Sequence, residues 1–443
     1  MLAESKAARR LASGGNMQKV VVIGAGLAGA AAALRLADAG QSVTLVEARG
    51  RLGGRTYSRA FGDLPDLWEF GGGWICERHL RIKALTNRFG MGLRPRLSVI
   101  ERRWHDGAVL RTDAPVAADK LELHQQGLAV VQADSMAMQG GAGRWEGGNP
   151  WAGMSFADYM QVRGLPETVR REFIAWWMLS GSADITKVNV LDALQCASYC
   201  GGTMEATLEE LTHTIEGGVG TLTARIIAAS GARVILGDAV VAVADRGDHA
   251  ALRLSSGQEL RAGQLVVAVP VNALDRIRFD PPLRPSQTQL SKEGHQGRAV
   301  KVLMRVRGVL PGVLVTGEAE GLRLMLSERT LSDGTTAVIG FGLADEVADT
   351  SGAAIDRALR QFFPEATLLD NDWHDWVRDP WSAGTWVSHG LGQSPLFAAP
   401  EWAQLGRLHF AGSDIAATGS GWFEGAIASG EAAADAILAL AES

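Results

Sequence analysis

Cysteine is scarce in this chain: only Cys76, Cys196 and Cys200 occur among its 443 residues. An odd number of scattered cysteines cannot form a disulfide framework, and such sparse usage fits a reducing compartment. The spacing of Cys196 and Cys200 would place both on one face of a helix, but two thiols do not make a structural zinc site. We therefore predict small buried residues there. Because the nine histidines show no H-E-x-x-H or paired spacing, we predict no metal site.

An excess of basic over acidic residues and long apolar runs are also missing. The chain has 43 Lys and Arg against 49 Asp and Glu, a formal charge of -6, so it lacks the cationic excess typical of nucleic-acid binding. No apolar run approaches the roughly 18 residues of a membrane span, and the G-x-S-x-G motif of α/β-hydrolases does not occur. We predict a cytoplasmic protein without nucleic-acid or membrane partners.

The first residues carry little structural information. Arg9 and Arg10 are not followed by the apolar region of a signal peptide, so we expect residues 1–16 to form a flexible leader. Met17 stands directly before the first predicted strand, and both Met1 and Met17 remain candidates for the start of the protein.

Glycine, by contrast, is abundant, with 54 residues, and the most informative glycines follow the first predicted strand. Residues 19–23 (KVVVI) are typical of a buried parallel strand, and residues 24–29 (GAGLAG) match G-x-G-x-x-G. An Ala-rich helix over 28–39 and a strand over 42–46 follow, and Glu47 then supplies an acceptor for ribose hydroxyls. This strand–helix–strand unit predicts dinucleotide binding.

Each position of the glycine motif has a physical reason. Gly24 permits the tight turn, Gly26 lets the backbone approach a pyrophosphate, and Gly29 lets the helix pack closely on the strand. The start of the helix, at Leu27 and Ala28, offers unpaired N–H groups to the phosphate.

The segment that follows distinguishes FAD from NAD. Residues 47–56 (EARGRLGGRT) include Glu47, Ala48, Arg49, Gly54 and Arg55. Adjacent glycines bring the backbone close to a cofactor, and Arg55 supplies a fork of donors for phosphate. This E-A-R-x-R-x-G-G-R-T run resembles the second signature of the flavin amine oxidase family, which includes monoamine and polyamine oxidases. The resemblance implies that the cofactor is FAD.

Later segments carry the same resemblance. Residues 70–75 (FGGGWI), with Gly71, Gly72, Gly73 and Trp74, look like the family's Gly-Gly segment beside the isoalloxazine ring. Residues 215–222 (IEGGVGTL) resemble the G-G-x-x-x-L that precedes the second visit to the FAD domain.

Two strand-forming stretches extend the resemblance. Residues 234–243 (VILGDAVVAV) read as a strand pair, in which Val240 matches the valine whose backbone holds the adenine in relatives. Residues 265–270 (LVVAVP) resemble the strand that closes the cofactor domain.

The pattern between these segments predicts an interleaved architecture. Residues 98–214 are mostly helical in pattern, with helices expected over 119–133 and 167–179 and a Gly-rich loop over 140–148. Residues 297–386 are rich in predicted strands (300–306, 323–326 and 337–341) around a helix over 353–363. We predict an α/β fold in which a Rossmann-type FAD-binding domain is interleaved with an α+β substrate-binding domain. The expected FAD-binding segments are 17–97, 215–296 and 387–443, and the substrate-binding segments are 98–214 and 297–386.

Lys301 is a single cation within an otherwise apolar strand, 299–304 (AVKVLM). Burying such a lysine is costly unless it is used, but a lysine on an edge strand that faces water would explain the pattern equally well. Members of the family carry a lysine four residues after a glycine, here Gly297. The resemblance therefore implies that Lys301 holds a water near flavin N5.

Tryptophan is the most frequent aromatic residue, with 13 copies, and most of these are expected to be core residues. Residues 376–386 (WVRDPWSAGTW) resemble the family's W-x-x-x-x-(Y/W)-S-x-G-x-(Y/W) motif. By this match Trp376 packs on the dimethylbenzene end of the flavin, Trp381 belongs to the cofactor site, and Trp386 forms one wall of a substrate cage. Electron-rich rings also suit a basic nitrogen.

The C-terminal region resembles the third FAD signature. Residues 410–414 (FAGSD) and 419–426 (GSGWFEGA) carry it, and Trp422 falls where relatives place the opposing cage wall. Asp414 departs from the commoner Glu, and we expect it still to reach a ribityl or phosphate neighbour. The cofactor-binding residues of this region are expected to be Gly412, Ser413, Asp414, Trp422, Phe423 and Ala426.

Two further departures from the family pattern limit the chemistry. Thr385 occupies the position where covalent members attach the flavin through Cys, so we expect a non-covalent flavin. Amino-acid oxidases tend to carry an Arg where this chain has Trp74 and Ile75, which disfavours an α-amino acid as substrate unless another Arg replaces it.

The resemblance implies an FAD-dependent amine oxidase with Lys301, Trp386 and Trp422 in catalytic roles. A neutral amine would be oxidised to an imine, which water hydrolyses to an aldehyde or ketone, while O2 is reduced to H2O2. Two alternatives stay open: a dehydrogenase or desaturase that uses another electron acceptor, and a flavin-bearing binding protein with little turnover. The sequence also leaves open which amine is the substrate and whether the protein forms a homodimer.

Overall fold

The computed structural model describes residues 18–138 and 149–442. The predicted leader 1–16 and the predicted loop 140–148 lie outside the described residues. In the described part of the chain no helix is long and apolar enough to cross a membrane.

The chain begins with the predicted strand–helix–strand unit. It consists of β1 (Gln18–Ile23), α2 (Leu27–Asp38) and β2 (Val43–Glu47), and the two strands pair in parallel. Val20 to Ile23 and all of β2 are buried, because a parallel strand covered on both faces needs a continuous apolar run. The first sheet has nine strands, with the path β10-β2-β1-β13-β12-β11-β14 and with β21 pairing β13 and β20. Its other strands are β10 (Arg233–Leu236), β11 (Val240–Asp245), β12 (Ala250–Leu254), β13 (Glu259–Val267), β14 (Arg278–Asp280), β20 (Gln404–Leu405) and β21 (Leu408–Phe410).

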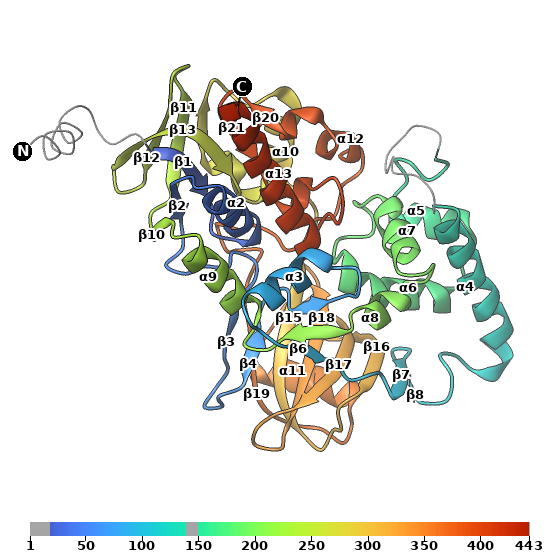
Figure 1. The fold of residues 1–443 in the computed structure, drawn as a ribbon. Coiled ribbons are helices and arrows are strands. Elements are labelled where there is room, and N and C mark those ends of the chain that lie inside the picture. The colour runs from blue at the N-terminus through green and yellow to red at the C-terminus, as the bar shows by residue number, and fades with distance from the viewer. Residues whose placement is uncertain (1–17, 139–148, 443) are drawn as a thin grey trace, which may run out of the picture.

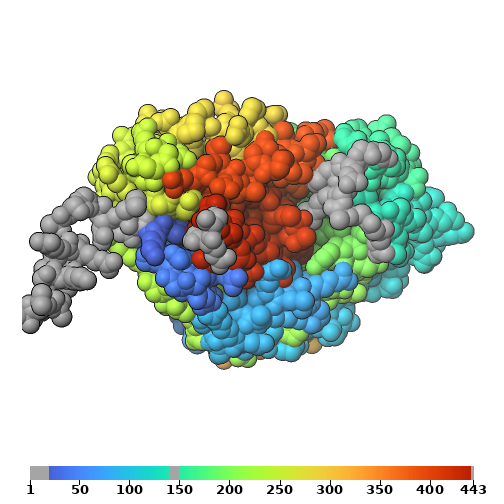
Figure 2. All heavy atoms as spheres, turned by 45° about the horizontal axis from the view of Figure 1, so that its top comes forward, coloured from blue at the N-terminus to red at the C-terminus, as the bar shows by residue number. Residues whose placement is uncertain are grey.

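The two ends of the described chain meet on this sheet. The C-terminal helix α13 (Phe423–Glu442) lies beside α2, and Ala-rich faces allow the two helices to approach closely (Figure 1). A side chain at Gly430 would place its Cβ 2.1 Å from the Ala28 carbonyl oxygen, so only glycine fits at this crossing. Figure 2 shows the red C-terminal residues adjoining the blue N-terminal residues on one face.

A second sheet of seven strands lies at the other end of the molecule (Figure 1). Its order is β19-β15-β18-β17-β16-β7-β8. The strands are β7 (Glu101–His105), β8 (Leu110–Arg111), β15 (Ala299–Arg307), β16 (Val313–Ala319), β17 (Leu322–Thr330), β18 (Thr336–Leu343) and β19 (Thr367–Trp373). The helix α6 (Glu167–Ser180) packs on this sheet through Phe173 and Trp177, and α11 (Gly352–Phe362) packs with strand residues such as Val302 in a separate core.

Shorter elements connect and cover the two sheets. The other helices are α3 (Leu80–Arg88), α4 (Leu121–Met136), α5 (Phe156–Val162), α7 (Val190–Tyr199), α8 (Ala206–Glu210), α9 (Val219–Ala229), α10 (Pro285–Glu293) and α12 (Ser394–Phe397). The other strands are β3 (Ser58–Ala60), β4 (Leu67–Glu69), β5 (Trp74–Ile75), β6 (Leu93–Pro95) and β9 (His213–Ile215). The helices α4 to α7 form a separate group beside the second sheet (Figure 1).

The predicted fold class, an α/β Rossmann-type unit interleaved with an α+β unit, is confirmed. The division into five segments stays a prediction. Residues 98–214 begin with the strands β7 and β8 before turning helical, which the sequence pattern missed because both strands are only half-buried. The stretch 234–243 does contain two strands, but the expectation of a strand pair is wrong: β10 pairs with β2, and β11 pairs with β12 and β14.

Candidate active site

A single large cavity runs from the β1–α2 loop to the second sheet. It encloses about 1430 Å³ free of protein atoms, including its open mouth. Most of the predicted cofactor-site residues line it: Gly24, Gly26, Leu27, Ala28, Glu47, Ala48, Arg49, Gly54, Arg55, Gly71, Gly72, Val240, Trp376, Trp381, Gly412, Ser413, Phe423 and Ala426. Lys301, Trp386 and Trp422 also line it, so the chemistry-bearing residues expected from distant parts of the sequence come together around one space.

The glycine loop shapes one end of this cavity. Gly24 has φ +102°, and a Cβ there would lie 2.4 Å from the Ala268 carbonyl oxygen, so the turn requires glycine. Gly26 directly precedes α2 and lies close to Gly54. A Cβ on Gly54 would lie 3.1 Å from the Gly26 Cα. The result is a bare backbone cradle at the N-terminus of a helix, which is the geometry that suits a phosphate.

Glu47 closes the cradle from the end of β2. Its carboxylate accepts the Ala25 N–H at 2.8 Å and the Arg49 N–H at 2.9 Å, and the side chain is buried. Glu47 therefore holds the shape of the glycine loop, in addition to presenting its oxygens at the cavity wall.

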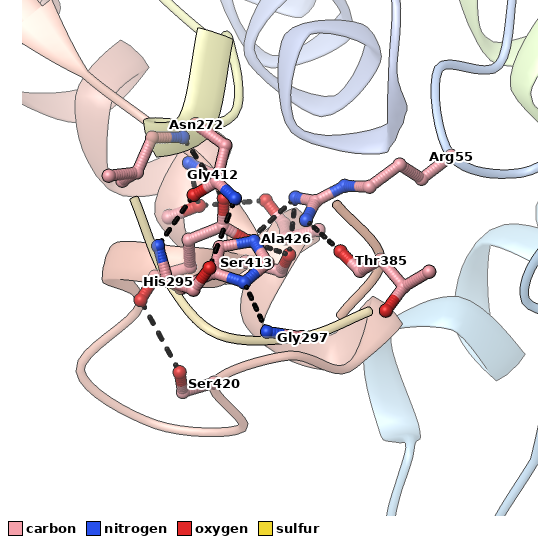
Figure 3. A network of polar contacts seen from close by, with 12 residues as sticks. Arg55, Asn272, His295, Gly297, Thr385, Gly412, Ser413, Ser420 and Ala426 are labelled. Carbon is pink, nitrogen blue, oxygen red and sulfur yellow. Dashed lines mark hydrogen bonds and ion pairs between the residues drawn. The ribbon is translucent and has the colours of Figure 1, made fainter. Parts of the chain in front are cut away.

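Arg55 reaches across the cavity to the C-terminal segment (Figure 3). Its guanidinium donates to the Thr385 carbonyl oxygen at 2.7 Å, to Ser413 Oγ at 3.1 Å and to Asp414 Oδ1 at 2.7 Å. Burial works against ionisation of Asp414, but the Arg55 charge and the Val271 N–H hold its pKa below the ordinary value. Asp414 does not line the cavity; it holds Arg55 at the wall.

A second arginine is fixed in the same way. Arg49 donates to both oxygens of Asp379, at 2.8 and 3.2 Å, and to Ser382 Oγ. Burial opposes ionisation of Asp379, yet its hydrogen bond with His374 and the Arg49 charge lower its pKa to about 2. Arg49 is thus a preorganised cation whose position does not depend on a ligand.

Lys301 lies on the inner strand β15, between β18 and β19, so the edge-strand alternative is wrong. Its side chain is 9% exposed, and its Nζ donates to the carbonyl oxygens of Glu69 at 2.7 Å and Gly71 at 3.1 Å. Burial lowers the pKa of Lys301. Because an ammonium group has three N–H donors, one remains for a group in the cavity.

The tryptophans form the walls at this end. Trp376 Nε1 donates to the Phe70 carbonyl oxygen at 2.9 Å, which sets its ring against Gly71. Trp386 Nε1 is buried, with no hydrogen-bond partner in the part of the chain that the structure describes. Trp422 packs against His79, with ring centroids 5.3 Å apart, and burial lowers the pKa of His79 to about 4. His79 is therefore a neutral support for Trp422 at pH 7.

Four predicted cofactor-site residues do not line the cavity but contact residues that do or that lie next to them. Gly29 packs against the Gly24 carbonyl oxygen, as its motif position predicts, and Gly73 packs against the Glu69 side chain. Trp74 points to Glu328, and Asp414 holds Arg55. The sequence analysis did not assign these lining residues to the site: Ile23, Val46, Gly53, Thr56, Phe70, Ala239, Ala268, Val269, Pro270, Ala273, Arg276, Ile277, Ala299, Ser382 and Gly421. Most of them lie inside a stretch that the sequence analysis singles out, and Ala273, Arg276 and Ile277 follow residues 265–270 closely. Position in or beside a motif was therefore the only available signal.

No group of three metal-ligating side chains occurs among residues 18–138 and 149–442. Cys196 is half-buried near the end of α7 and Cys200 is buried directly after it. The cavity wall offers backbone donors, three arginines (Arg49, Arg55 and Arg276), a lysine and aromatic rings.

A mixed sheet with a glycine cradle at its first helix, joined to a second sheet that supplies a buried lysine, is typical of a nucleotide-binding oxidoreductase. The chain matches the family of flavin containing amine oxidoreductases over residues 27–438, and it belongs to that family. It is thus a flavoenzyme that acts on amines.

Individual relatives agree with this assignment. The chain is 27% identical over 428 residues to (S)-6-hydroxynicotine oxidase of Paenarthrobacter nicotinovorans, covering 95% of this chain and 100% of the relative. It is 26% identical to nicotine dehydrogenase of Pseudomonas putida over 427 residues, covering 94% and 87%. The fold is similar to that of cyclohexylamine oxidase from Brevibacterium oxydans, with a TM-score of 0.83, 24% identity and coverage of 96% and 100%. It is equally similar to putrescine oxidase bound to putrescine, with a TM-score of 0.83, 23% identity and coverage of 96% and 99%.

Proposed function

We propose that this protein holds FAD non-covalently and oxidises an amine to an imine, with O2 as electron acceptor. The observation that carries the proposal is the single cavity in which the glycine cradle, Glu47 and Arg55 lie at the walls together with Lys301 and Trp386. When bound, FAD supplies the two-electron acceptor that no side chain provides.

The cavity fits the parts of an FAD molecule. The bare backbone at Gly26 and Gly54 leaves room for a pyrophosphate, and Arg55 adds a cationic donor. Glu47 is placed to accept ribose hydroxyls, and Val240 lines the region that we assign to the adenine. Gly71 and Gly72 line the cavity, and the Gly71 carbonyl oxygen accepts the Lys301 ammonium at 3.1 Å, so we assign this segment to the isoalloxazine.

The amine is proposed to bind between Trp386 and Trp422. Aromatic walls exclude water and favour the uncharged amine, which has the lone pair that oxidation requires. With FAD bound, the carbon bearing the nitrogen would give up its hydrogen with two electrons to the flavin, and the nitrogen would lose a proton to solvent. Water would then hydrolyse the imine to a carbonyl compound and an amine or ammonia. Lys301 holds a water at the cavity wall with its remaining N–H.

The flavin is expected to be released by acid. Thr385 stands at the position of the attaching cysteine in covalent relatives, and none of the described residues that line the cavity is Cys, His or Tyr. Precipitation of the yellow protein with trichloroacetic acid should therefore leave FAD in the supernatant, identified by chromatography and absorbance. Colour retained in the washed pellet would contradict a non-covalent cofactor.

Replacement of Glu47 by alanine should weaken FAD binding. The change removes a charged acceptor for the ribose and the support of the glycine loop through Ala25. A lost hydrogen bond to a charged group costs about 1.5–3 kcal/mol, which is roughly a ten- to hundred-fold rise in the dissociation constant. Fluorescence titration of the FAD-free protein with FAD measures this dissociation constant. Asp38→Ala, at the exposed end of α2, is the control, and an unchanged dissociation constant for Glu47→Ala would reject the assignment.

Anaerobic mixing with a panel of amines tests the reaction itself. Bleaching of the flavin absorbance by an amine, followed by recovery and H2O2 release on admission of air, is the expected result. Bleaching without H2O2 release would instead favour a dehydrogenase, which the mixed oxidase and dehydrogenase relatives make the second candidate. Absence of bleaching by every amine would leave a flavin-bearing binding protein.

A further inference from the structure

Glu328 is a carboxylate of the second sheet that lies behind the catalytic end of the cavity. It stands on β17, and its side chain is 14% exposed. Its Oε1 accepts the indole N–H of Trp74 at 2.5 Å, a contact between residues 254 positions apart. Arg96 Nε lies 4.0 Å from the same oxygen.

Trp74 connects this carboxylate to Lys301. One cation, the Arg96 guanidinium, lies 4.2 Å from the centre of the Trp74 ring, and a second, Lys301 Nζ, lies 5.6 Å from it. Aromatic faces attract cations, whereas the indole N–H is a donor that suits an anion. Glu328 therefore fixes the orientation in which Trp74 lies near both cations.

Glu328 is also the anion that this buried group requires. Lys301 and Arg96 are both buried, and burial lowers the pKa of each. The Glu328 charge opposes that effect on the pKa of both side chains, whereas the Glu69 charge opposes it on Lys301 alone. The neighbouring Glu69 carboxylate instead accepts Ser58 Oγ–H and the Val219 N–H, and burial raises its pKa. Glu328 is thus the carboxylate that contacts Trp74 and approaches Arg96.

We propose that Glu328 is a positioning residue for amine oxidation: through its hydrogen bond to Trp74 and its charge, it holds Lys301 in place at the cavity wall. This inference rests on the proposed function, because it assigns Lys301 to the reacting end of the flavin. It does not require Glu328 to touch substrate or cofactor, and Glu328 does not line the cavity.

Stopped-flow reoxidation of the flavin by O2, after anaerobic reduction by an amine that reduces the wild-type enzyme, tests the inference. Glu328→Ala should lower the rate of reoxidation by about tenfold or more, because Lys301 is the cation that we expect to stabilise the negative charge of that half-reaction. Glu328→Gln keeps an oxygen acceptor for the indole and loses the charge, so its rate should fall between those of Glu328→Ala and wild type. The amine dissociation constant, taken from the anaerobic reduction traces, should change less than about twofold.

Two further variants separate positioning from a general effect on folding. Trp74→Phe removes the indole N–H that Glu328 accepts. Because Trp74 and Glu328 act through this one contact, the rate of the double variant Trp74→Phe/Glu328→Ala should be no more than about twofold below that of the slower single variant. Glu318→Gln is the matched control, because Glu318 lies on the same sheet, 62% exposed, and pairs with Arg323 on the surface. It should leave the rate unchanged.

An independent readout comes from NMR of protein labelled with 15N-tryptophan. A strong hydrogen bond to a carboxylate should shift the Trp74 indole proton downfield, and Trp74→Phe assigns the signal by its loss. Glu328→Ala should move that signal upfield and leave the other indole signals in place. This measurement does not depend on turnover.

Several outcomes would overturn the inference. These are a reoxidation rate for Glu328→Ala within about twofold of wild type, an effect confined to the amine dissociation constant, or an unmoved indole signal. If the wild-type flavin is not reduced by any amine, the proposed function fails instead. Because the NMR result is independent of that failure, the two are distinguishable.

Discussion

Replacement of Lys301 by methionine is expected to slow reoxidation of the reduced flavin by O2 by about ten- to a thousand-fold, a loss of about 1.4–4 kcal/mol. The Lys301 ammonium is held by the carbonyl oxygens of Glu69 and Gly71 at the cavity wall, where we expect it to stabilise negative charge that develops beside it. Methionine keeps the length and apolar packing of the side chain, so the β15 strand should be retained. Amine binding should change much less than reoxidation.

Stopped-flow traces of the two half-reactions provide the measurement. Flavin reduction by the amine is recorded without oxygen, and reoxidation is recorded on mixing with oxygenated buffer. Lys292→Met, at an exposed position of α10, is the control for loss of a positive charge far from the cavity. If both half-reactions of Lys301→Met stay within about twofold of wild type, under 1 kcal/mol, Lys301 is not in the reaction site.

The parts of the fold that depend on local spacing could be predicted from the sequence. The unit β1–α2–β2 follows from a β-branched run, three glycines and an acid within about 30 residues, because each of these features acts on its near neighbours. The motif positions from Gly24 to Arg55 mostly reach the cavity for the same reason.

Contacts between distant segments could not be predicted in this way. The sequence gives no sign that Trp74 turns toward Glu328, because the partner lies on β17, and only the folded second sheet brings it near. Asp414 likewise pairs with Arg55, 359 positions away, and does not line the cavity. The family resemblance indicates which residues gather at the site, but it does not indicate which of them line the cavity and which ones support the lining residues.

The second large effect is expected on the stability of the protein when the ion pair between Asp414 and Arg55 is broken. Asp414 is 2% exposed, and its carboxylate accepts Arg55 Nη2–H at 2.7 Å and the Val271 N–H at 3.2 Å. Removing one partner of a fully buried ion pair costs about 3–5 kcal/mol, but the Arg55 side chain is 22% exposed. We therefore expect the cost of a lost hydrogen bond to a charged group, about 1.5–3 kcal/mol. Asp414→Ala should lower the free energy of unfolding at pH 7 by that amount, measured by urea unfolding of the FAD-free protein. Asp435→Asn, in an exposed pair with Arg35, should change it by at most about 1 kcal/mol.

The pH dependence gives this prediction a second, independent test. Burial works against ionisation of Asp414, but the Arg55 charge and the hydrogen bonds to the carboxylate hold its pKa below the ordinary value. A carboxyl group whose pKa is lower in the folded state stabilises the protein above its unfolded pKa, about 3.9 for aspartate, and loses that contribution as the pH falls. The isosteric variant Asp414→Asn cannot ionise, so wild type should be more stable than this variant at pH 7, and the difference should shrink as the pH falls below about 4. Equal stability of the two proteins at pH 7, or a difference that stays constant down to pH 3, would show that the Asp414 charge does not stabilise the fold.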